Sequence, residues 1–197
     1  MITDQSTNSF YIWDGYSPYQ GPAINDSDLW RFTADGEGGG DWGREPVTNG
    51  DVWGDFVRTL GTAYTSSNDM GFQFGGTFVG GGPVKNAKGF KTLNFTTMEW
   101  EEETDVPYPD ATLYGGSAIF VEKYGASGTV VVLGGLTNRD GSGSGYLSVD
   151  RAYLYDIAAK QWHYQDVSST GSEKPARWDR ACAVGVADTG DTDSFEM

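Results

Sequence analysis

Short apolar stretches that end on glycine recur along the chain and predict β-strands. They read F-Y-I-W-D-G-Y at residues 10–16, F-Q-F-G-G-T at residues 72–77 and T-V-V-V-L-G-G-L at residues 129–136. Aromatic and β-branched residues favour strands, and glycine allows the tight turn that ends each one. No window of 11–18 residues shows the apolar spacing of an amphipathic helix, so we expect almost no helix.

The strand-ending glycines recur at a fixed interval. They are 60 and 59 residues apart and are Gly15, Gly75 and Gly134. A second marker keeps nearly the same period, because three tryptophans lie 58 and 62 residues apart, namely Trp42, Trp100 and Trp162. Two markers that stay in phase over three units indicate an internal repeat.

Each unit holds two further strand candidates. An aromatic stretch precedes each tryptophan, and in these stretches Phe95 aligns with Ile157. Phe32 aligns with both if G-E-G-G-G at residues 36–40 is an insertion. A stretch rich in small residues precedes each later glycine-ended strand, at residues 61–67, 115–121 and 180–186. Four short strands per unit predict one antiparallel sheet, as in a propeller blade, with the small-residue strand innermost and the tryptophan filling the outer wedge.

These motifs resemble the kelch repeat: two glycines after an apolar strand, then Y-L-Y-D, then a tryptophan about six residues later. P-A-R-W-D-R-A-C-A-V at residues 175–184 also resembles the opening of a kelch blade. The resemblance implies an all-β, kelch-type β-propeller related to galactose oxidase. The first unit departs from the pattern, since W-D-G-Y has one glycine where the others have two. The long loops and the acidic, glycine-rich texture are most similar to fungal cell-surface kelch proteins, which often carry a transmembrane segment after the propeller.

The period predicts a single partial propeller over residues 1–197. A blade lacking its first strand occupies residues 1–50, full blades occupy 51–107 and 108–170, and the first strand of a further blade lies in 171–197. An arc of about three blades leaves faces and edges uncovered. We therefore expect a fragment of a larger protein, located at the cell surface or anchored to a membrane, with a cytoplasmic location as the alternative.

The net charge of the chain restricts which classes of molecule it can bind. The formal net charge of −15 opposes binding to nucleic acid and to anionic lipid. No run of 18 apolar residues exists, so we expect membrane attachment only through segments absent from this chain. The single cysteine, Cys182, cannot form an internal disulfide, and its alignment with Ala63 and Ala118 predicts a packed small residue in a strand.

Three long loops follow the glycine-ended strands, at residues 17–28, 77–88 and 136–150, and should share one face of the disc. Propeller function usually resides in such loops. We expect a protein or glycan partner to bind there through Tyr16, Tyr19, Phe78 and Arg139, the alternative being connectors without a ligand. Asn25 and Asn94 lie in N-glycosylation sequons, and whether either is modified stays open.

The residues that an enzyme needs are scarce. Galactose oxidase, a copper enzyme of the kelch type, uses two histidines, whereas His163 is the single histidine here and should be an exposed strand residue. No nucleophile elbow, phosphate loop or paired metal ligands appear. We expect no catalytic residue, no cofactor and no metal, and hence a non-catalytic interaction scaffold. Two alternatives remain: a carbohydrate-active enzyme whose site lies in missing blades, or an intracellular kelch scaffold that organises polarity.

Overall fold

The computed structural model describes residues 1–12, 29–49, 59–78, 84–138 and 145–168, together with 180, 182–184, 186–187 and 195–196. Strands dominate these residues, and their one helical element is the short 3-10 turn η2 (Pro109–Ala111). Most strands belong to three antiparallel sheets of four strands each. The all-β prediction is therefore confirmed for the described chain.

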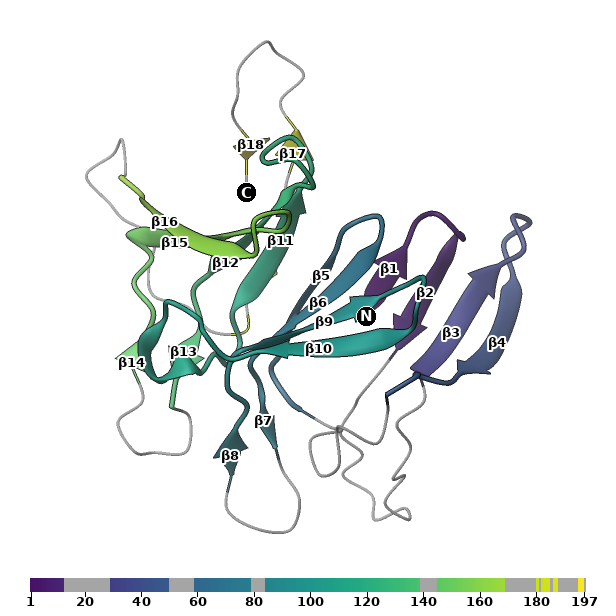
Figure 1. Ribbon diagram of the computed structural model, residues 1–197, viewed down its shortest axis with the longest axis horizontal. Helices are drawn as coiled ribbons and strands as arrows, with labels where there is room; N and C mark the ends of the chain where they lie inside the picture. Colours follow the sequence, from purple (N-terminus) through teal and green to yellow (C-terminus); the bar gives the residue numbers. More distant parts are fainter. Residues whose placement is uncertain are drawn as a thin grey trace.

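Each large sheet is a meander in which consecutive long strands pair (Figure 1). The first sheet contains β1 (Ile2–Asp4), β2 (Ser9–Ile12), β3 (Leu29–Ala34) and β4 (Gly40–Glu45). The second contains β5 (Ala63–Ser66), β6 (Met70–Phe74), β9 (Phe90–Asn94) and β10 (Glu99–Glu103). The third contains β11 (Ser117–Val121), β12 (Thr129–Leu133), β15 (Arg151–Asp156) and β16 (Gln161–Asp166). The second and third sheets hold the four predicted elements in the predicted order.

The first sheet corrects one expectation, because it does not lack its first strand. Residues Ile2–Asp4 form β1, in which Ile2 lies opposite Tyr11 of β2. The strand is hard to see in the sequence because it is short and polar, with Ile2 and Asp4 buried and Thr3 exposed. The Asp4 carboxylate accepts hydrogen bonds from the hydroxyls of Ser6 and Thr7, so a polar turn closes the hairpin.

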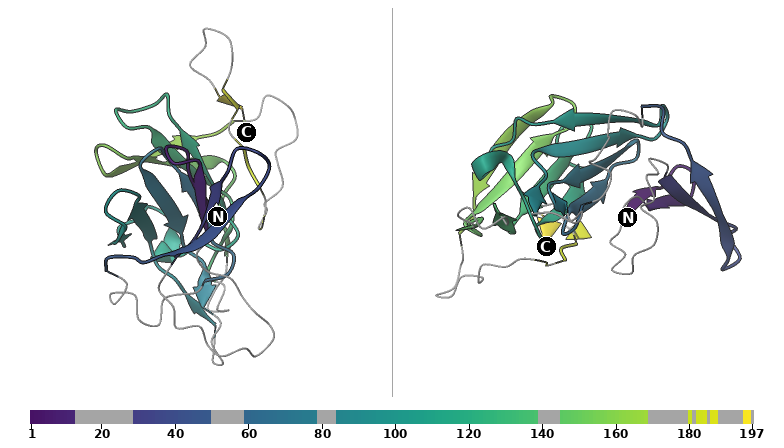
Figure 2. Two further views of the ribbon diagram at one scale, coloured as in Figure 1. Left: turned by 90° about the vertical axis from the view of Figure 1, so that its right-hand side faces the viewer. Right: turned by 90° about the horizontal axis from the view of Figure 1, so that it is seen from below.

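The first strands of the three sheets lie side by side. β5 contacts β11 of the third sheet and β1 of the first sheet. From this inner line the sheets spread apart towards β4, β10 and β16 (Figures 1 and 2). The described sheets form an open arc, and none of them closes into a ring.

The two glycine pairs end equivalent strands with the same backbone. The φ angles are 59° and 101° at Gly75 and Gly76, and 61° and 92° at Gly134 and Gly135. Such positive angles are readily adopted only by glycine. A Cβ atom at Gly75 would also collide with the carbonyl oxygen of Leu113 from the next unit. The repeat marker thus reflects both a left-handed turn and a close approach between units.

Backbone hydrogen bonds join successive units at the inner line. The Gly115 N–H donates to the Gly61 carbonyl at 2.6 Å, and the Arg180 N–H donates to the Gly115 carbonyl at 2.6 Å. All three residues are left-handed, with φ of 66°, 65° and 58°. We call this arrangement the inner ladder (Gly61, Gly115, Arg180). The position before the small-residue strand therefore repeats in three units, with Arg180 in the place of a glycine.

The three tryptophans occupy equivalent register positions opposite the third strand, paired as Trp42 with Phe32, Trp100 with Leu93 and Trp162 with Tyr155. Their burial differs. Trp100 is 3% exposed and Trp42 is 50% exposed, whereas Trp162 is partly buried against the core between the second and third sheets. Trp100 and Trp162 thus hold equivalent positions in adjacent sheets.

The register also corrects the alignment of Phe32. It corresponds to Leu93 and Tyr155, not to Phe95 and Ile157 as expected. Phe95 and Ile157 already lie in the turn after the third strand, where their N–H groups donate to the carbonyls of Asp69 and Gly128. In the first sheet Ala34 makes this bond, to Asn8. The assumed insertion shifted the alignment by two residues. Phe32 therefore faces the expected side of its strand but lies at a different position along it.

Two cores fill the wedges between sheets. Between the second and third sheets the largest buried side chains include Phe72, Phe74 and Phe90, packed against β12 and β15. Between the first and second sheets Leu29 and Trp100 share a smaller core with other apolar residues. Burying one such side chain stabilises the fold by about 1.5–3 kcal/mol. β12 pairs with both β11 and β15 and is therefore an interior strand of its sheet.

The last described strands are β17 (Val186–Ala187) and β18 (Phe195–Glu196), which pair with each other. Cys182 is exposed and lies outside a strand, so the expectation of a packed strand residue is wrong. No described strand pairs with residues 182–184, and hence no sheet covers that cysteine.

Over the described residues, the chain has no helix long and apolar enough to span a bilayer.

Candidate functional site

Two short hairpins follow the two glycine pairs. In one, β7 (Thr77–Phe78) pairs with β8 (Lys85–Asn86), and in the other β13 (Leu136–Thr137) pairs with β14 (Gly145–Tyr146). Both hairpins project from the same side of the arc, the lower side in Figure 1. The prediction that the loops after the glycine-ended strands share one face is confirmed for these two. We call this side the hairpin face (β7, β8, β13, β14).

The bases of the two hairpins are fixed in the same way. The Ala87 N–H donates to the Gly76 carbonyl at 2.9 Å, and the Leu147 N–H donates to the Gly135 carbonyl at 2.9 Å. Each first strand is also bridged to the segment before the small-residue strand, through Leu60 and Thr77 or Tyr114 and Leu136. These bonds make the hairpin face a rigid extension of the sheets rather than a pair of free loops.

Of the four predicted contact residues, the structure places one. Phe78 lies at the end of β7 opposite Lys85 and is partly exposed. Tyr16, Tyr19 and Arg139 lie outside the described residues. The sequence analysis missed Tyr146, which stands opposite Leu136 on β14 and is 45% exposed. An aromatic residue directly after the glycine- and serine-rich part of a loop is the signal that could have found it.

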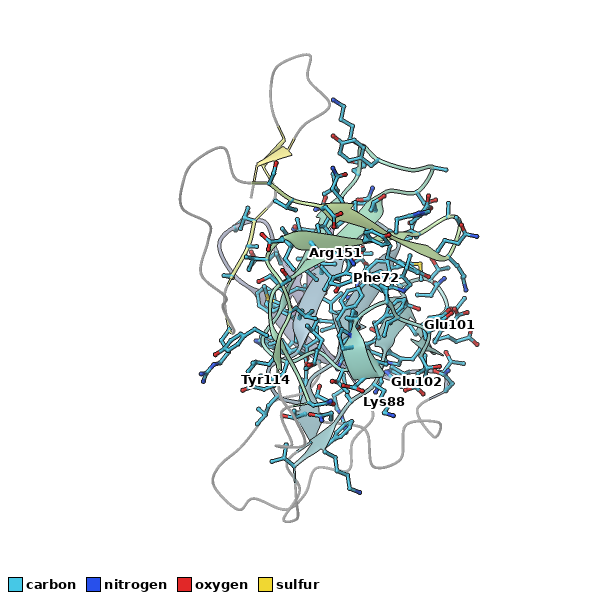
Figure 3. All side chains as sticks on the ribbon, turned by 90° about the vertical axis from the view of Figure 1, so that its left-hand side faces the viewer. Phe72, Lys88, Glu101, Glu102, Tyr114 and Arg151 are labelled. Atoms are coloured by element: carbon cyan, nitrogen blue, oxygen red, sulfur yellow. The ribbon has the colours of Figure 1, made fainter. Side chains whose placement is uncertain are left out.

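A polar link holds the β13–β14 hairpin to the turn η2. The Thr112 Oγ1 accepts from the Asn138 N–H at 2.9 Å, and the Asn138 side-chain amide donates to the Asp110 carboxylate. Asp110, Ala111 and Asn138 have φ of 56°, 54° and 49°, a left-handed conformation that costs about 1–2 kcal/mol per non-glycine residue. Tyr114 and Lys88, labelled in Figure 3, lie towards this lower end of the molecule.

A cleft of about 340 Å³ lies between the outer edges of the second and third sheets. The rings of Phe90, Tyr155 and Trp162 line its inner part, and Glu103 and Lys160 line its mouth. Burial, followed by the carboxylates of Glu103 and Glu101, raises the pKa of Tyr155 to about 12. This environment thus favours the protonated form of the Tyr155 phenol.

One ion pair spans the two sheets beside this cleft. The Lys160 Nζ lies 2.9 Å from the Glu101 Oε2, and both side chains are more than half exposed. Figure 3 shows Glu101 near the edge of the molecule and Phe72 near its centre. His163 is exposed on β16, as predicted. In the part of the chain that the structure describes, no group of three or more His, Cys, Asp or Glu side chains is placed to hold a metal ion.

The outer face of the first sheet is apolar and exposed. The rings of Phe10 and Phe32 stack with centroids 5.0 Å apart, and the Trp42 ring packs edge-on against them at 5.5 and 5.2 Å. Trp30 is 48% exposed on the same face. In the second and third sheets the equivalent face is covered by the preceding sheet. We call this surface the open face (Phe10, Ile12, Trp30, Phe32, Trp42).

No protein-family model matches the chain, and no curated protein matches its sequence. Arguments about function therefore rest on the residues and their geometry.

Proposed function

We propose that this chain is part of a kelch-type β-propeller that acts as a non-catalytic interaction scaffold. In this proposal the hairpin face binds a protein or glycan partner at the cell surface. The observation that carries it is the matched pair of hairpins β7–β8 and β13–β14, which project from adjacent sheets on one side with identical backbone support. Partners are commonly bound by loops that a rigid scaffold positions in this way.

The chemistry of the hairpin face supports binding rather than catalysis. It offers the aromatic rings of Phe78 and Tyr146, with Lys85 beside Phe78. Aromatic side chains provide large contact areas at little conformational cost, and they dominate binding energies at interfaces. Within the described residues, no specific observation favours the carbohydrate-active enzyme or the intracellular polarity scaffold.

A direct test compares aromatic substitutions on and off the hairpin face. The purified chain is screened against arrays of glycans and of secreted protein domains, and each hit is measured by biolayer interferometry. The double variant F78A/Y146A should weaken binding by tenfold or more, on the order of 1.4 kcal/mol or above. The matched control is Tyr164→Ala, which removes an aromatic ring that is 61% exposed on the outer strand β16.

Two results would contradict the proposal. Equal loss in both variants would show that general aromatic exposure drives binding. Unchanged binding in F78A/Y146A would place the partner elsewhere on the chain. Circular dichroism of each variant separates a loss of binding from a loss of fold.

A further inference from the structure

The segment after the first sheet caps the outer edge of the second. We call it the first strap (residues 46–49). The Asn49 side-chain amide donates to the Trp100 carbonyl at 2.8 Å, and its oxygen accepts from the Trp100 N–H at 3.0 Å. The Thr48 N–H donates to the Met98 carbonyl at 2.9 Å, and its hydroxyl donates to the Thr97 carbonyl at 2.6 Å. The first strap therefore provides hydrogen-bond partners for the backbone at the outer edge of β10, around Trp100.

The segment after the second sheet enters the next wedge but makes no such bonds. This second strap (residues 104–108) follows β10 as the first strap follows β4, and Val106 packs against its core as Val47 does in the first strap. Pro107 and Tyr108 follow Val106, as Thr48 and Asn49 follow Val47 in the first strap. Proline has no N–H and no hydroxyl to donate.

Tyr108 turns inward instead of capping the edge. It is 2% exposed, and its ring packs edge-on against Trp162 with centroids 6.1 Å apart. Its hydroxyl donates to the Gly89 carbonyl at 3.3 Å. The second strap thus packs apolar side chains against the third sheet. It provides no hydrogen-bond partner for the backbone groups at the outer edge of that sheet.

The two hairpins that carry the tryptophans are otherwise equivalent. Met98 and Lys160 occupy the same turn position with φ of 54° and 50°. Trp162 faces Tyr155 in the register in which Trp100 faces Leu93. The N–H and carbonyl of Trp162 therefore point away from the sheet, as those of Trp100 do. Across the described ranges, no hydrogen bond reaches this N–H or this carbonyl from another part of the chain.

The 340 Å³ cleft lies at this uncapped edge, since Pro107, Lys160, Gln161 and Trp162 are among its lining residues. An uncapped strand edge is a template for an added peptide strand, whose main-chain and amide groups complete the hydrogen bonding. The carboxylates of Glu103 and Asp105 line the same cleft. They favour a peptide with positively charged flanks.

We propose that the cleft between the second and third sheets binds an extended, cationic peptide segment of a partner that presents a Thr-Asn or Ser-Asn pair to the Trp162 backbone. The first strap is the template for this ligand, because it shows the same pair bound to an equivalent edge. The proposal is independent of the hairpin face, which lies on a different side of the sheets.

Amide hydrogen exchange with two synthetic peptides tests the proposal on the whole chain. The probe is a capped peptide K-P-V-T-N-G-K, and the control peptide K-P-V-V-L-G-K keeps the charge but loses the polar pair. In the free protein the Trp162 amide should exchange at least about tenfold faster than the Trp100 amide, because no partner protects it. The probe should slow exchange at Trp162 by about tenfold, and the control peptide should leave it unchanged.

A variant of the second strap gives an independent measurement. The double variant Pro107→Thr/Tyr108→Asn restores the Thr-Asn pair that the first strap uses, so it should cap the Trp162 edge in cis and weaken probe binding by about tenfold. Circular dichroism checks that it is folded, and Pro46→Thr, a change in the other strap, should leave probe binding unchanged. Three results would each overturn the proposal: a Trp162 amide as slow as that of Trp100 in the free protein, equal effects of both peptides, or unaltered probe binding by the folded double variant.

Discussion

Among the described residues, the second sheet is covered on both faces, whereas the first sheet is covered on one. Trp100 and Trp42 hold equivalent positions in their sheets, yet the first is 3% exposed and the second 50% exposed. The difference arises outside each unit, because Trp100 packs against the first sheet while no preceding described sheet covers Trp42. In a repeat protein, a residue's burial is thus set by the neighbouring unit as much as by its own.

The open face shows how the equivalent side chains pack where no described sheet covers them. Phe10, Phe32 and Trp42 pack on one another, which shields part of each ring. Such pairs contribute about 0.5–1.5 kcal/mol beyond the area that they bury. Trp100, by contrast, has the side chains of two sheets around it.

The tryptophans themselves should differ most. Trp100→Ala should lower the free energy of unfolding by about 3–5 kcal/mol, because it leaves a cavity between two sheets. Trp42→Ala should lower it by about 1 kcal/mol, since only the ring contacts of the open face are lost. Urea unfolding followed by circular dichroism measures both. Equal losses would mean that the two sheets are equally covered in solution.

Glycine substitutions separate packing from backbone strain. Gly75→Ala should cost about 3 kcal/mol, because its left-handed φ is combined with a collision against Leu113. Gly36 is also left-handed, with φ of 80°, but it has open space around it in the first sheet's outer hairpin. Gly36→Ala should therefore cost only about 1 kcal/mol. Thermal unfolding of both variants distinguishes the two contributions, and similar losses would point to strain alone.

Acid should loosen the first sheet before the second. Burial raises the pKa of the Asp4 carboxyl, but the hydrogen bonds from Ser6 and Thr7 together lower it by a larger amount. The pKa therefore lies below its ordinary value of 3.8. The resulting stabilisation is present above pH 3.8 and is lost as the pH falls through the lower pKa of the folded state. Amides of β2 should then lose exchange protection at a higher pH than those of β9. In Asp4→Asn this difference should shrink, and an unchanged difference would exclude Asp4 as its source.

The ion pair across the second and third sheets should matter least. Lys160 and Glu101 are 58% and 59% exposed, so their attraction is screened by water and salt. A double-mutant cycle with Lys160→Met and Glu101→Gln should give a coupling energy below about 0.5 kcal/mol that falls further in 1 M salt. A larger, salt-insensitive coupling would show that the wedge depends on charge as well as on aromatic packing.

Much of the fold could be predicted because two of its structural features, the tight turns and the wedges between sheets, each require a particular type of residue. Left-handed turns favour glycine, which is why Gly75 and Gly134 mark the strand ends, and at Gly75 there is also no room for a Cβ atom. The wedge needs a large side chain, which is why Trp100 and Trp162 keep the period. The short polar strand β1 left no such signature, and the register of Phe32 depended on a loop whose length varies between units.

The candidate sites were less predictable, because they depend on contacts between units. Phe78 could be found from its place after the glycine pair, but nothing local reveals that Asn49 caps Trp100. The capping requires a strap from one unit to meet the edge of another, 51 residues away in sequence. The contrast of V-T-N with V-P-Y after two equivalent strands is the only trace of it. This sequence difference can be interpreted only when the positions of both straps relative to their sheets are known.

The inner ladder has a mechanical consequence. Its backbone bonds join the second and third sheets beside the strands that lie closest together, β5 and β11. Farther out, the angle between these two sheets depends on the volume of the rings packed between them, such as Phe90 and Trp162. Smaller side chains at these positions should therefore narrow that angle while leaving the inner bonds intact. The spacing of these neighbouring sheets is thus set by side-chain volume at the outer edge, and their connection by backbone bonds at the inner edge.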